Sequence, residues 1–577
     1  MDSVDSPSSP FACSECKTRK VKCDKTKPTC HRCIKDGAGC HYPTARKRPP
    51  PLPSRPQVQE MENRLVELEN QLSQKEAMER QLLLNLDTVR AGTELVGTGR
   101  YEQLPPQWQI ETLTNLYFEK LHPEMPMVHP SRYLASLYQP PHMQPPMCLQ
   151  YIIMALAAGA AVAYKELADP FYRRSRYYIE ADEMKEDGYH VTLAHCQCWA
   201  LIGAYEAQNL LFARGSMSTS RAVRLSQVLG IHLLDGPGAV NPSMPPPRDW
   251  VEMEERRRTF WAVFYLDRGT SSSATWPVLI DVTTRLPASE EAYQSSIEEP
   301  SITLPEALTY DSQPRSAFAC RVVAIHLLRE CLDLTQSHHH HHSAALSDPA
   351  AKDSIFWGRF NQLDSSLLVA FATLPEALRC PCNAHDSNAV LVNLQLHTAT
   401  IALYRAAVAV SHSYTPYSQQ AAHQQDEASS TIARIEAMIH PAAQVIVTTI
   451  ALAKDINTRF RNPFVAFAGF MAASVFLKEY MSTGNEESVH KLTALLDVMV
   501  AVGKESPRSF PSTLAVQLAQ ELDRTGVDPT AMHKVRPLVD KMDVSTPVLG
   551  KEDGGTGMVI LCPFEQPVES RPQTMDG

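Results

Sequence analysis

The apolar residues between residue 100 and about residue 545 recur with the spacing of helices rather than strands. Long runs rich in Ala and Leu dominate this region, and β-branched alternation between tight turns is hard to find. The longest runs cover residues 147–164, 191–213, 390–410 and 441–480. The pattern predicts a mostly α protein with one large, all-helical region at 100–545.

Low-complexity segments interrupt or follow this region. Residues 335–346 contain five consecutive histidines, His338–His342, and residues 411–430 are rich in Ser, Gln, Ala and His. Both segments predict exposed loops; for the histidine run, a loop insertion is favoured over a metal site. Residues 546–577, with Gly-Gly-Thr-Gly and scattered prolines, predict a flexible tail.

A second pattern precedes the helical region. Residues 58–89 repeat apolar positions in steps of three and four, as in a coiled coil for dimerisation. The seam is most regular over Val58–Leu72 and carries Lys75 and Glu79 further on. The alternative is an amphipathic helix packed on its own domain. Residues 44–57 form a basic, Pro-rich linker, which cannot be a helix interior, and residues 1–10 are expected to be disordered.

Composition narrows the class of protein. Hydrophobic residues make up 44% and charged residues 20%, which excludes a wholly disordered, collagenous or multi-span membrane protein. The longest uncharged stretch, near Tyr151–Tyr164, is too short to cross about 30 Å of hydrocarbon and predicts a buried helix. The N-terminus lacks the features of a signal peptide. We therefore expect a reduced, intracellular chain with no membrane partner.

Charge is distributed unevenly along the chain. The net charge is −10, yet residues 11–48 hold eleven Lys and Arg against three acids, a local charge of +8. The remainder of the chain is therefore strongly acidic. A basic segment in an acidic chain favours a nucleic-acid partner for that segment.

Six of the fourteen cysteines lie in the same basic segment. Their spacing is C-x2-C-x6-C, repeated once in tandem. Cysteine thiolate is a preferred ligand of zinc, and a disulfide framework is disfavoured in a reduced compartment. The predicted metal ligands are Cys13, Cys16, Cys23, Cys30, Cys33 and Cys40.

Six thiolates match two zinc ions better than one. One tetrahedral ion would leave two cysteines unused, whereas two ions need eight ligand positions, which six cysteines supply if two of them bridge. The duplication makes Cys13 and Cys30 equivalent, so we expect this pair to bridge. A segment this short has little hydrophobic core, so metal binding must provide its folding free energy.

The basic residues inside this motif suggest its partner. The six residues from Lys17 to Lys22 read KTRKVK, and a short helix there would project several cations from one side. Such a face can neutralise the phosphates of double-stranded DNA and release their counterions, which favours binding.

The segment resembles the fungal zinc binuclear cluster (Zn2Cys6) DNA-binding domain. The similarity rests on FACSECKTRKVKCD from Phe11, on KPTCHRC from Lys27 and on CHYP from Cys40. The resemblance implies a DNA-binding domain at 11–43 whose first helix enters the major groove. Arg19 and Lys20 then correspond to residues that reach the bases of a CGG triplet, where Arg can bond to guanine. Lys17, Lys22 and Lys25 correspond to residues that contact phosphate.

The helical region resembles the regulatory domain of the same fungal transcription factors over roughly residues 105–480. The matching stretches begin at Tyr117, Arg221, Glu254 and Arg285. Within them, Arg256–Arg258, Asp267 and Arg268 could form a ligand-binding charge cluster, but helix-packing ion pairs are favoured, and no site is assigned.

The resemblance implies a nuclear, sequence-specific transcription factor, an activator that binds DNA as a homodimer and contacts the transcription machinery. We expect no enzymatic activity, since the helical region shows none of the common catalytic motifs. The alternatives are a zinc-dependent protein-interaction adapter and a small-molecule sensor, neither binding DNA directly. An effector of the helical region and a pathway-specific role stay open.

Overall fold

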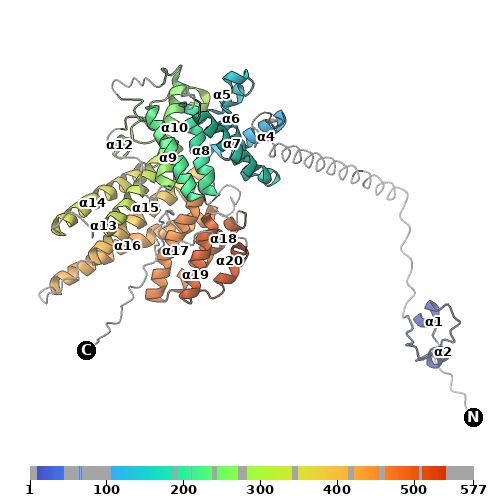
Figure 1. Ribbon diagram of the computed structural model, residues 1–577. Helices are drawn as coiled ribbons and strands as arrows, with labels where there is room; N and C mark the ends of the chain where they lie inside the picture. Colours follow the sequence, from blue (N-terminus) through green and yellow to red (C-terminus); the bar gives the residue numbers. More distant parts are fainter. Residues whose placement is uncertain are drawn as a thin grey trace, which may run out of the picture. The chain divides into compact units, whose positions relative to one another are not determined.

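The computed structural model describes two separate units of the chain, residues 1–91 and residues 92–577 (Figure 1). The described residues are 9–43, 64, 67, 105–185, 191–209, 211–236, 244–270, 282–340, 349–412, 422–453, 462–505 and 510–540. Within these ranges the elements are helices and no strand occurs. The prediction of a mostly α protein is confirmed.

The first unit contains two short helices, α1 (Ser14–Thr18) and α2 (His31–Lys35). Its buried cluster consists of four cysteines, Cys13, Cys16, Cys30 and Cys33. Only a few partly buried side chains, such as Val21 and Tyr42, pack against them. The centre of this unit is therefore built from sulfur rather than hydrocarbon.

The second unit begins with a group of helices around α6, whose residues Cys148–Ala158 are all buried. Helix α6 packs on α4 and α7, and α8 packs on α9. The elements of this group are α4 (Gln107–Lys120), η1 (His122–Glu124), α5 (Pro130–Ser136), η2 (Pro141–Met143), α6 (Met147–Ala160), η3 (Val162–Leu167), α7 (Ala168–Glu183), α8 (Leu193–Gln208), α9 (Phe212–Val228), α10 (Trp250–Thr270), α11 (Glu290–Ser295) and α12 (Leu304–Ala307).

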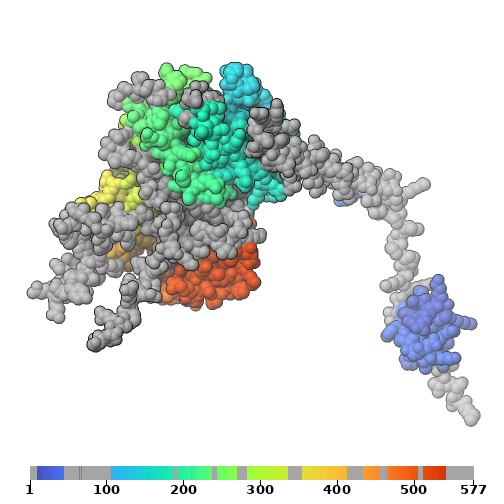
Figure 2. Space-filling view, in the orientation of Figure 1, coloured from blue at the N-terminus to red at the C-terminus, as the bar shows by residue number. Residues whose placement is uncertain are grey.

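A second group of helices completes this unit. Helix α15 packs on α13 and α16, and α17 to α20 pack on one another. Figure 2 shows α18 to α20 as an orange to red surface of this unit. The elements are α13 (Ala317–His340), α14 (Pro349–Thr373), η5 (Glu376–Leu378), α15 (Ser387–His412), α16 (Ala422–Ala453), α17 (Pro463–Thr483), α18 (Glu486–Glu505), α19 (Phe510–Arg524) and α20 (Ala531–Val539).

Local sequence explains where α17 begins and ends. The side chain of Asn462 accepts a hydrogen bond from the backbone N–H of Phe464, and Pro463 occupies the first helical position, where its missing N–H costs nothing. Gly484 ends the helix in a left-handed conformation, with φ of 69°. A residue without a Cβ suits this conformation.

Three boundaries differ from the sequence-based expectations. Helix α13 continues to His340 and α16 begins at Ala422, so the loop predictions are wrong for 335–340 and for 422–430. Existing helices extend at little cost per residue, even through low-complexity sequence. The buried helix expected near Tyr151–Tyr164 ends at Ala160, and Val162 is 90% exposed. The described residues do not include the rest of the histidine run or the tail. Of the segment 58–89, they include only Arg64 and Glu67.

Two helical segments, Ala433–Ala453 and Phe464–Thr483, are long and apolar enough to cross a membrane. They lie in α16 and α17, which pack on each other and on α15. In the more apolar parts of these segments, 44% and 67% of the residues are buried inside the unit. Packing between helices accounts for their apolar composition.

Buried ion pairs join α10 to its surroundings. Arg258 Nε lies 3.0 Å from Glu254 Oε1, and Arg258 Nη1 lies 2.6 Å from Glu290 Oε2. Arg258 also donates to the carbonyl oxygens of Pro126 and Ala288. Other cations of this cluster pair similarly: Arg256 with Glu252, Arg257 with Asp235 and Arg268 with Glu330. The interpretation as helix-packing ion pairs is confirmed for Arg257, Arg258 and Arg268, which pair with other segments, whereas the pair of Arg256 lies within α10.

Replacing Arg258 with methionine is expected to lower the free energy of unfolding by about 3–5 kcal/mol, because it removes the closest cation from a buried carboxylate, Glu254. Arg248→Met is the matched control. Arg248 pairs with Glu252, but its side chain is 81% exposed, so its loss should cost less than about 1 kcal/mol. Urea unfolding of the full chain measures both. Equal effects would contradict a structural role for the Arg258 pairs.

Candidate zinc centre and DNA interface

The tandem sequence repeat forms a repeated structure in the first unit. Cys13 caps α1 by accepting from the backbone N–H of Cys16, and Cys30 caps α2 by accepting from that of Cys33, both at 3.4 Å. Each helix ends in the same way, with bonds from Val21 N–H to the Cys16 carbonyl and from Ala38 N–H to the Cys33 carbonyl. A shift of seventeen residues thus relates the two halves.

The six cysteines lie together. Two groups of four have all their sulfur atoms within 4.8 Å of one another: Cys13, Cys16, Cys23 and Cys30 form one, and Cys13, Cys30, Cys33 and Cys40 the other. Cys13 and Cys30 belong to both groups. The sulfur of Cys13 lies 3.8 Å from those of Cys23 and Cys30, and the sulfurs of Cys16 and Cys30 are 3.6 Å apart.

This donor set fits zinc. A tetrahedral zinc ion with bonds of about 2.3 Å places its sulfur ligands about 3.8 Å apart, close to the separations observed. Burial raises the pKa of the Cys13 thiol to about 12. Zinc must therefore displace a proton from this thiol as it binds. Its binding would supply folding free energy that residues 9–43 do not gain from a hydrocarbon core.

An acid that the sequence did not single out connects the two halves. Asp24 Oδ2 accepts from the Thr26 hydroxyl at 2.6 Å and from the His31 backbone N–H at 3.1 Å, and it lies 2.7 Å from His31 Nδ1. These hydrogen bonds hold the pKa of Asp24 well below its usual value. Asp24 lies seven residues before the start of α2, so no local helix-start pattern indicates this role.

The five cations expected at the DNA surface are all exposed: Lys17, Arg19, Lys20, Lys22 and Lys25. Of the cations in the helix expected over Lys17–Lys22, α1 carries only Lys17, because it ends at Thr18. Lys20 lies just beyond the helix in a left-handed conformation, with φ of 52°, and Lys25 has φ of 64°. The cations are therefore presented by a helix end and the turn that follows it.

Arg19 already has acidic neighbours. Its Nε lies 2.8 Å from Glu15 Oε1 and its Nη1 lies 3.6 Å from Asp36 Oδ2. The Arg19 side chain is 49% exposed. Pairs between exposed charges contribute little to stability, so Arg19 can exchange them for another partner at low cost.

The repeat reveals a chemical difference between two halves of the same shape. The positions equivalent to Arg19 and Lys20 are Asp36 and Gly37, and Gly37 has φ of 63°. The first half thus carries two cations where the second carries an acid and a glycine. The sequence analysis did not compare these positions, although the seventeen-residue cysteine repeat aligns them.

Both units match known protein families. Residues 11–49 match the fungal Zn(2)-Cys(6) binuclear cluster domain, and residues 114–348 match the fungal specific transcription factor domain. These matches fall on the cysteine unit and on the first part of the helical unit. No solved structure matches the chain.

Several fungal regulators are similar over longer stretches. The chain is 25% identical over 507 residues to the pigment biosynthesis transcriptional activator pigB of Monascus ruber, covering 82% of this chain and 87% of that protein. It is 28% identical over 399 residues to the azaphilone cluster-specific transcription factor azaR of Aspergillus niger, covering 66% and 82%. It is 28% identical over 333 residues to the citrinin biosynthesis transcriptional activator mrl3 of Monascus ruber, covering 49% and 64%.

These similarities agree with the geometry of the first unit, in which six clustered cysteines and exposed cations occur together. The chain is a DNA-binding transcription factor that carries a fungal zinc binuclear cluster (Zn2Cys6) domain and a fungal specific transcription factor domain.

Proposed function

We propose that the six cysteines hold two zinc ions, with Cys13 and Cys30 bridging, and that this cluster reads CGG-type triplets in duplex DNA as part of a homodimer. The observation that carries the proposal is the pair of four-sulfur groups sharing two cysteines, with exposed cations beside them. The ligands of one ion are Cys13, Cys16, Cys23 and Cys30, and those of the other are Cys13, Cys30, Cys33 and Cys40.

The first half of the cluster faces DNA in this proposal. Arg19 and Lys20 follow α1, and their equivalents in the second half, Asp36 and Gly37, offer no cation to a base. Arg19 can bond to the O6 and N7 atoms of guanine. Lys17, Lys22 and Lys25 contact phosphates and position the cluster without reading sequence.

Glycine substitutions test these roles with little disturbance of the backbone. Lys20 and Lys25 both have positive φ, which glycine adopts without strain. Lys20→Gly should weaken binding to a CGG site by about 1–3 kcal/mol and reduce the preference over altered triplets. Lys25→Gly should weaken binding to all duplexes alike and reduce the salt dependence by roughly one unit. Fluorescence anisotropy at several salt concentrations measures both effects.

Lys35→Ala is the matched control for this experiment, since Lys35 is an exposed cation in α2 of the second half. Its loss should change affinity least. A larger change in sequence preference for Lys25→Gly than for Lys20→Gly would contradict the assigned roles. Absence of any salt-dependent duplex binding by the unmodified chain would favour the adapter hypothesis.

Dimerisation rests on the heptad pattern of residues 58–89. One cluster covers about three base pairs, too few to specify a site in a genome, so two clusters at a fixed separation are needed. Arg64 and Glu67, the described residues of this segment, are helical and exposed, as expected outside the seam. Residues 44–57 would set the distance between the two triplets.

The names of the relatives suggest which kind of genes this chain regulates. Two relatives are named as activators of pigment and citrinin biosynthesis, and a third is named for an azaphilone cluster. We infer that this chain acts in the nucleus as an activator of a biosynthetic gene cluster and recruits the transcription machinery, without enzymatic activity of its own. Mapping of bound sites across the genome, together with transcript profiles of a deletion strain, tests this role.

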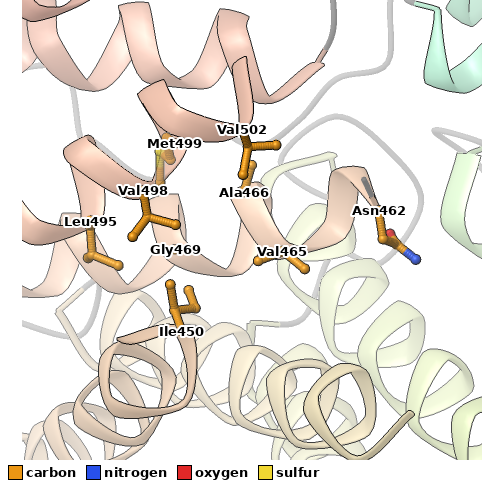
Figure 3. Close-up of a pocket in the computed structure, with 9 residues that line it drawn as sticks. All are labelled: Ile450, Asn462, Val465, Ala466, Gly469, Leu495, Val498, Met499 and Val502. Atoms are coloured by element: carbon orange, nitrogen blue, oxygen red, sulfur yellow. The ribbon is translucent and has the colours of Figure 1, made fainter. Parts of the chain in front are cut away.

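A small-molecule effector finds little room in the pocket between α16, α17 and α18 (Figure 3). The pocket is lined by apolar side chains including Ile450, Leu495 and Met499, and its cavity is about 10 Å³. That is space for about one water molecule. A Cβ at Gly469 would lie 3.0 Å from Met499 Cε, so this glycine allows the helices to approach closely. The pocket is a packing feature rather than an effector site.

A further inference from the structure

A second group of metal-ligating side chains lies in the helical unit. Cys148 on α6, Asp182 on α7 and His195 on α8 each direct one ligand atom to a common point, and these atoms lie within 4.8 Å of one another. All three residues are buried: Cys148 is 0% exposed, His195 2% and Asp182 8%. Three helices thus meet at a cysteine, a histidine and a carboxylate.

Both nitrogens of the His195 ring have a partner. Nε2 lies 3.1 Å from Asp182 Oδ2, and Nδ1 lies 2.7 Å from the hydroxyl of Thr192, the residue that caps α8. Lys185 Nζ donates to the other carboxylate oxygen of Asp182 at 2.5 Å. Metal-binding histidines and carboxylates are commonly held in this way by partners on their far side.

A second thiol lies near this group. Cys198 lies three residues after His195, which places both side chains on the same face of α8. Its thiol is within hydrogen-bonding reach of the Cys148 thiol and lies 3.6 Å from the Ser175 hydroxyl. The three ligand atoms that lie within 4.8 Å of one another do not include its sulfur, so Cys198 borders the site rather than completing it.

We propose that Cys148, Asp182 and His195 bind one zinc ion in the helical unit. Sulfur, imidazole and carboxylate are donors that zinc prefers, and three protein ligands leave one position of a tetrahedral site for a further ligand. The Nε2 to Oδ2 separation suits two ligands of one ion, whose bonds to nitrogen and oxygen are each about 2.0–2.2 Å.

Charge supports this site. The Asp182 carboxylate is paired with Lys185, and a Cys148 thiolate beside it would add a further buried negative charge, which a divalent ion compensates. The competing interpretation is a metal-free hydrogen-bond network that joins α7 and α8.

The test uses the full chain with the six N-terminal cysteines replaced by alanine, which removes the zinc cluster of the first unit. After expression with zinc and extensive dialysis, elemental analysis should find one zinc ion per chain. Adding Cys148→Ala or His195→Asn should abolish this zinc. Circular dichroism confirms that each variant remains helical.

Cys196→Ala is the matched control. Cys196 is the neighbouring buried cysteine on α8, but its sulfur contacts the Ala222 carbonyl instead. This variant should keep its zinc. A six-alanine chain that binds no zinc, or zinc retained by Cys148→Ala, would overturn the proposal. If the added variants do not fold, the six-alanine chain loaded with cobalt(II) decides: thiolate-to-cobalt charge-transfer absorption supports the site, and its absence overturns it.

Discussion

Replacing Cys30 with serine is expected to remove two zinc ions from the full chain and to abolish specific DNA binding. Cys30 belongs to both four-sulfur groups, so its loss disrupts both proposed sites. Residues 9–43, the described part around the cysteines, have no hydrocarbon core to compensate, and structural zinc contributes roughly 10–16 kcal/mol of binding free energy in small domains. Affinity for a CGG duplex should fall by more than about 100-fold, equivalent to about 2.7 kcal/mol. Native mass spectrometry and anisotropy provide the measurements.

Cys16→Ser provides the comparison within the same cluster. Cys16 belongs to one group only, so its loss should cost at most one ion. Cys382→Ser controls for the loss of any thiol, because Cys382 is exposed in the helical unit. If Cys30→Ser and Cys16→Ser lost the same amount of zinc, Cys30 would not be a bridging ligand.

Replacing Leu65 and Leu68 with glutamate is expected to produce a monomer whose zinc content is unchanged. Both leucines occupy seam positions of the proposed coiled coil, where buried charge opposes association. A monomer loses the gain from binding two triplets at once, so affinity for a two-triplet site should fall by about 10²–10⁴-fold. Affinity for a single triplet should stay nearly constant. Analytical ultracentrifugation reports the oligomeric state.

Glu67→Lys is the control for this experiment. It changes the charge of the same helix at an exposed position outside the seam, and should leave the dimer intact. A Leu65→Glu, Leu68→Glu chain that stayed dimeric and bound DNA normally would show that the 58–89 segment packs within its own chain.

Sequence was most informative about the first unit, because its chemistry lies within about thirty residues. The tandem cysteine spacing alone indicated the shared pair, and both groups in the structure contain Cys13 and Cys30. It did not indicate that α1 ends at Thr18. Glycine is the usual residue in a left-handed turn after a helix, but Lys20 occupies this one. Residue preferences therefore did not indicate the turn.

The helical unit was predictable in class but not in its contacts. Ala- and Leu-rich periodicity correctly indicated helices, whereas composition misled at the histidine run, where α13 continues to His340. Cys148, Asp182 and His195 are brought together by helix packing across more than forty residues of sequence. Only the spacing of His195 and Cys198 could have drawn attention to them, and that spacing is common by chance.

The left-handed conformation of Lys20 links DNA recognition to zinc supply. A residue with a Cβ loses roughly 1–2 kcal/mol in this conformation, whereas Gly37 fills the equivalent position without strain. Since we expect metal binding to provide the folding free energy of this unit, a less stable backbone should lower zinc affinity by the same free energy. About 1.4 kcal/mol corresponds to a tenfold change in affinity. The residue proposed to read DNA therefore also raises the concentration of free zinc that the cell must maintain for the regulator to fold.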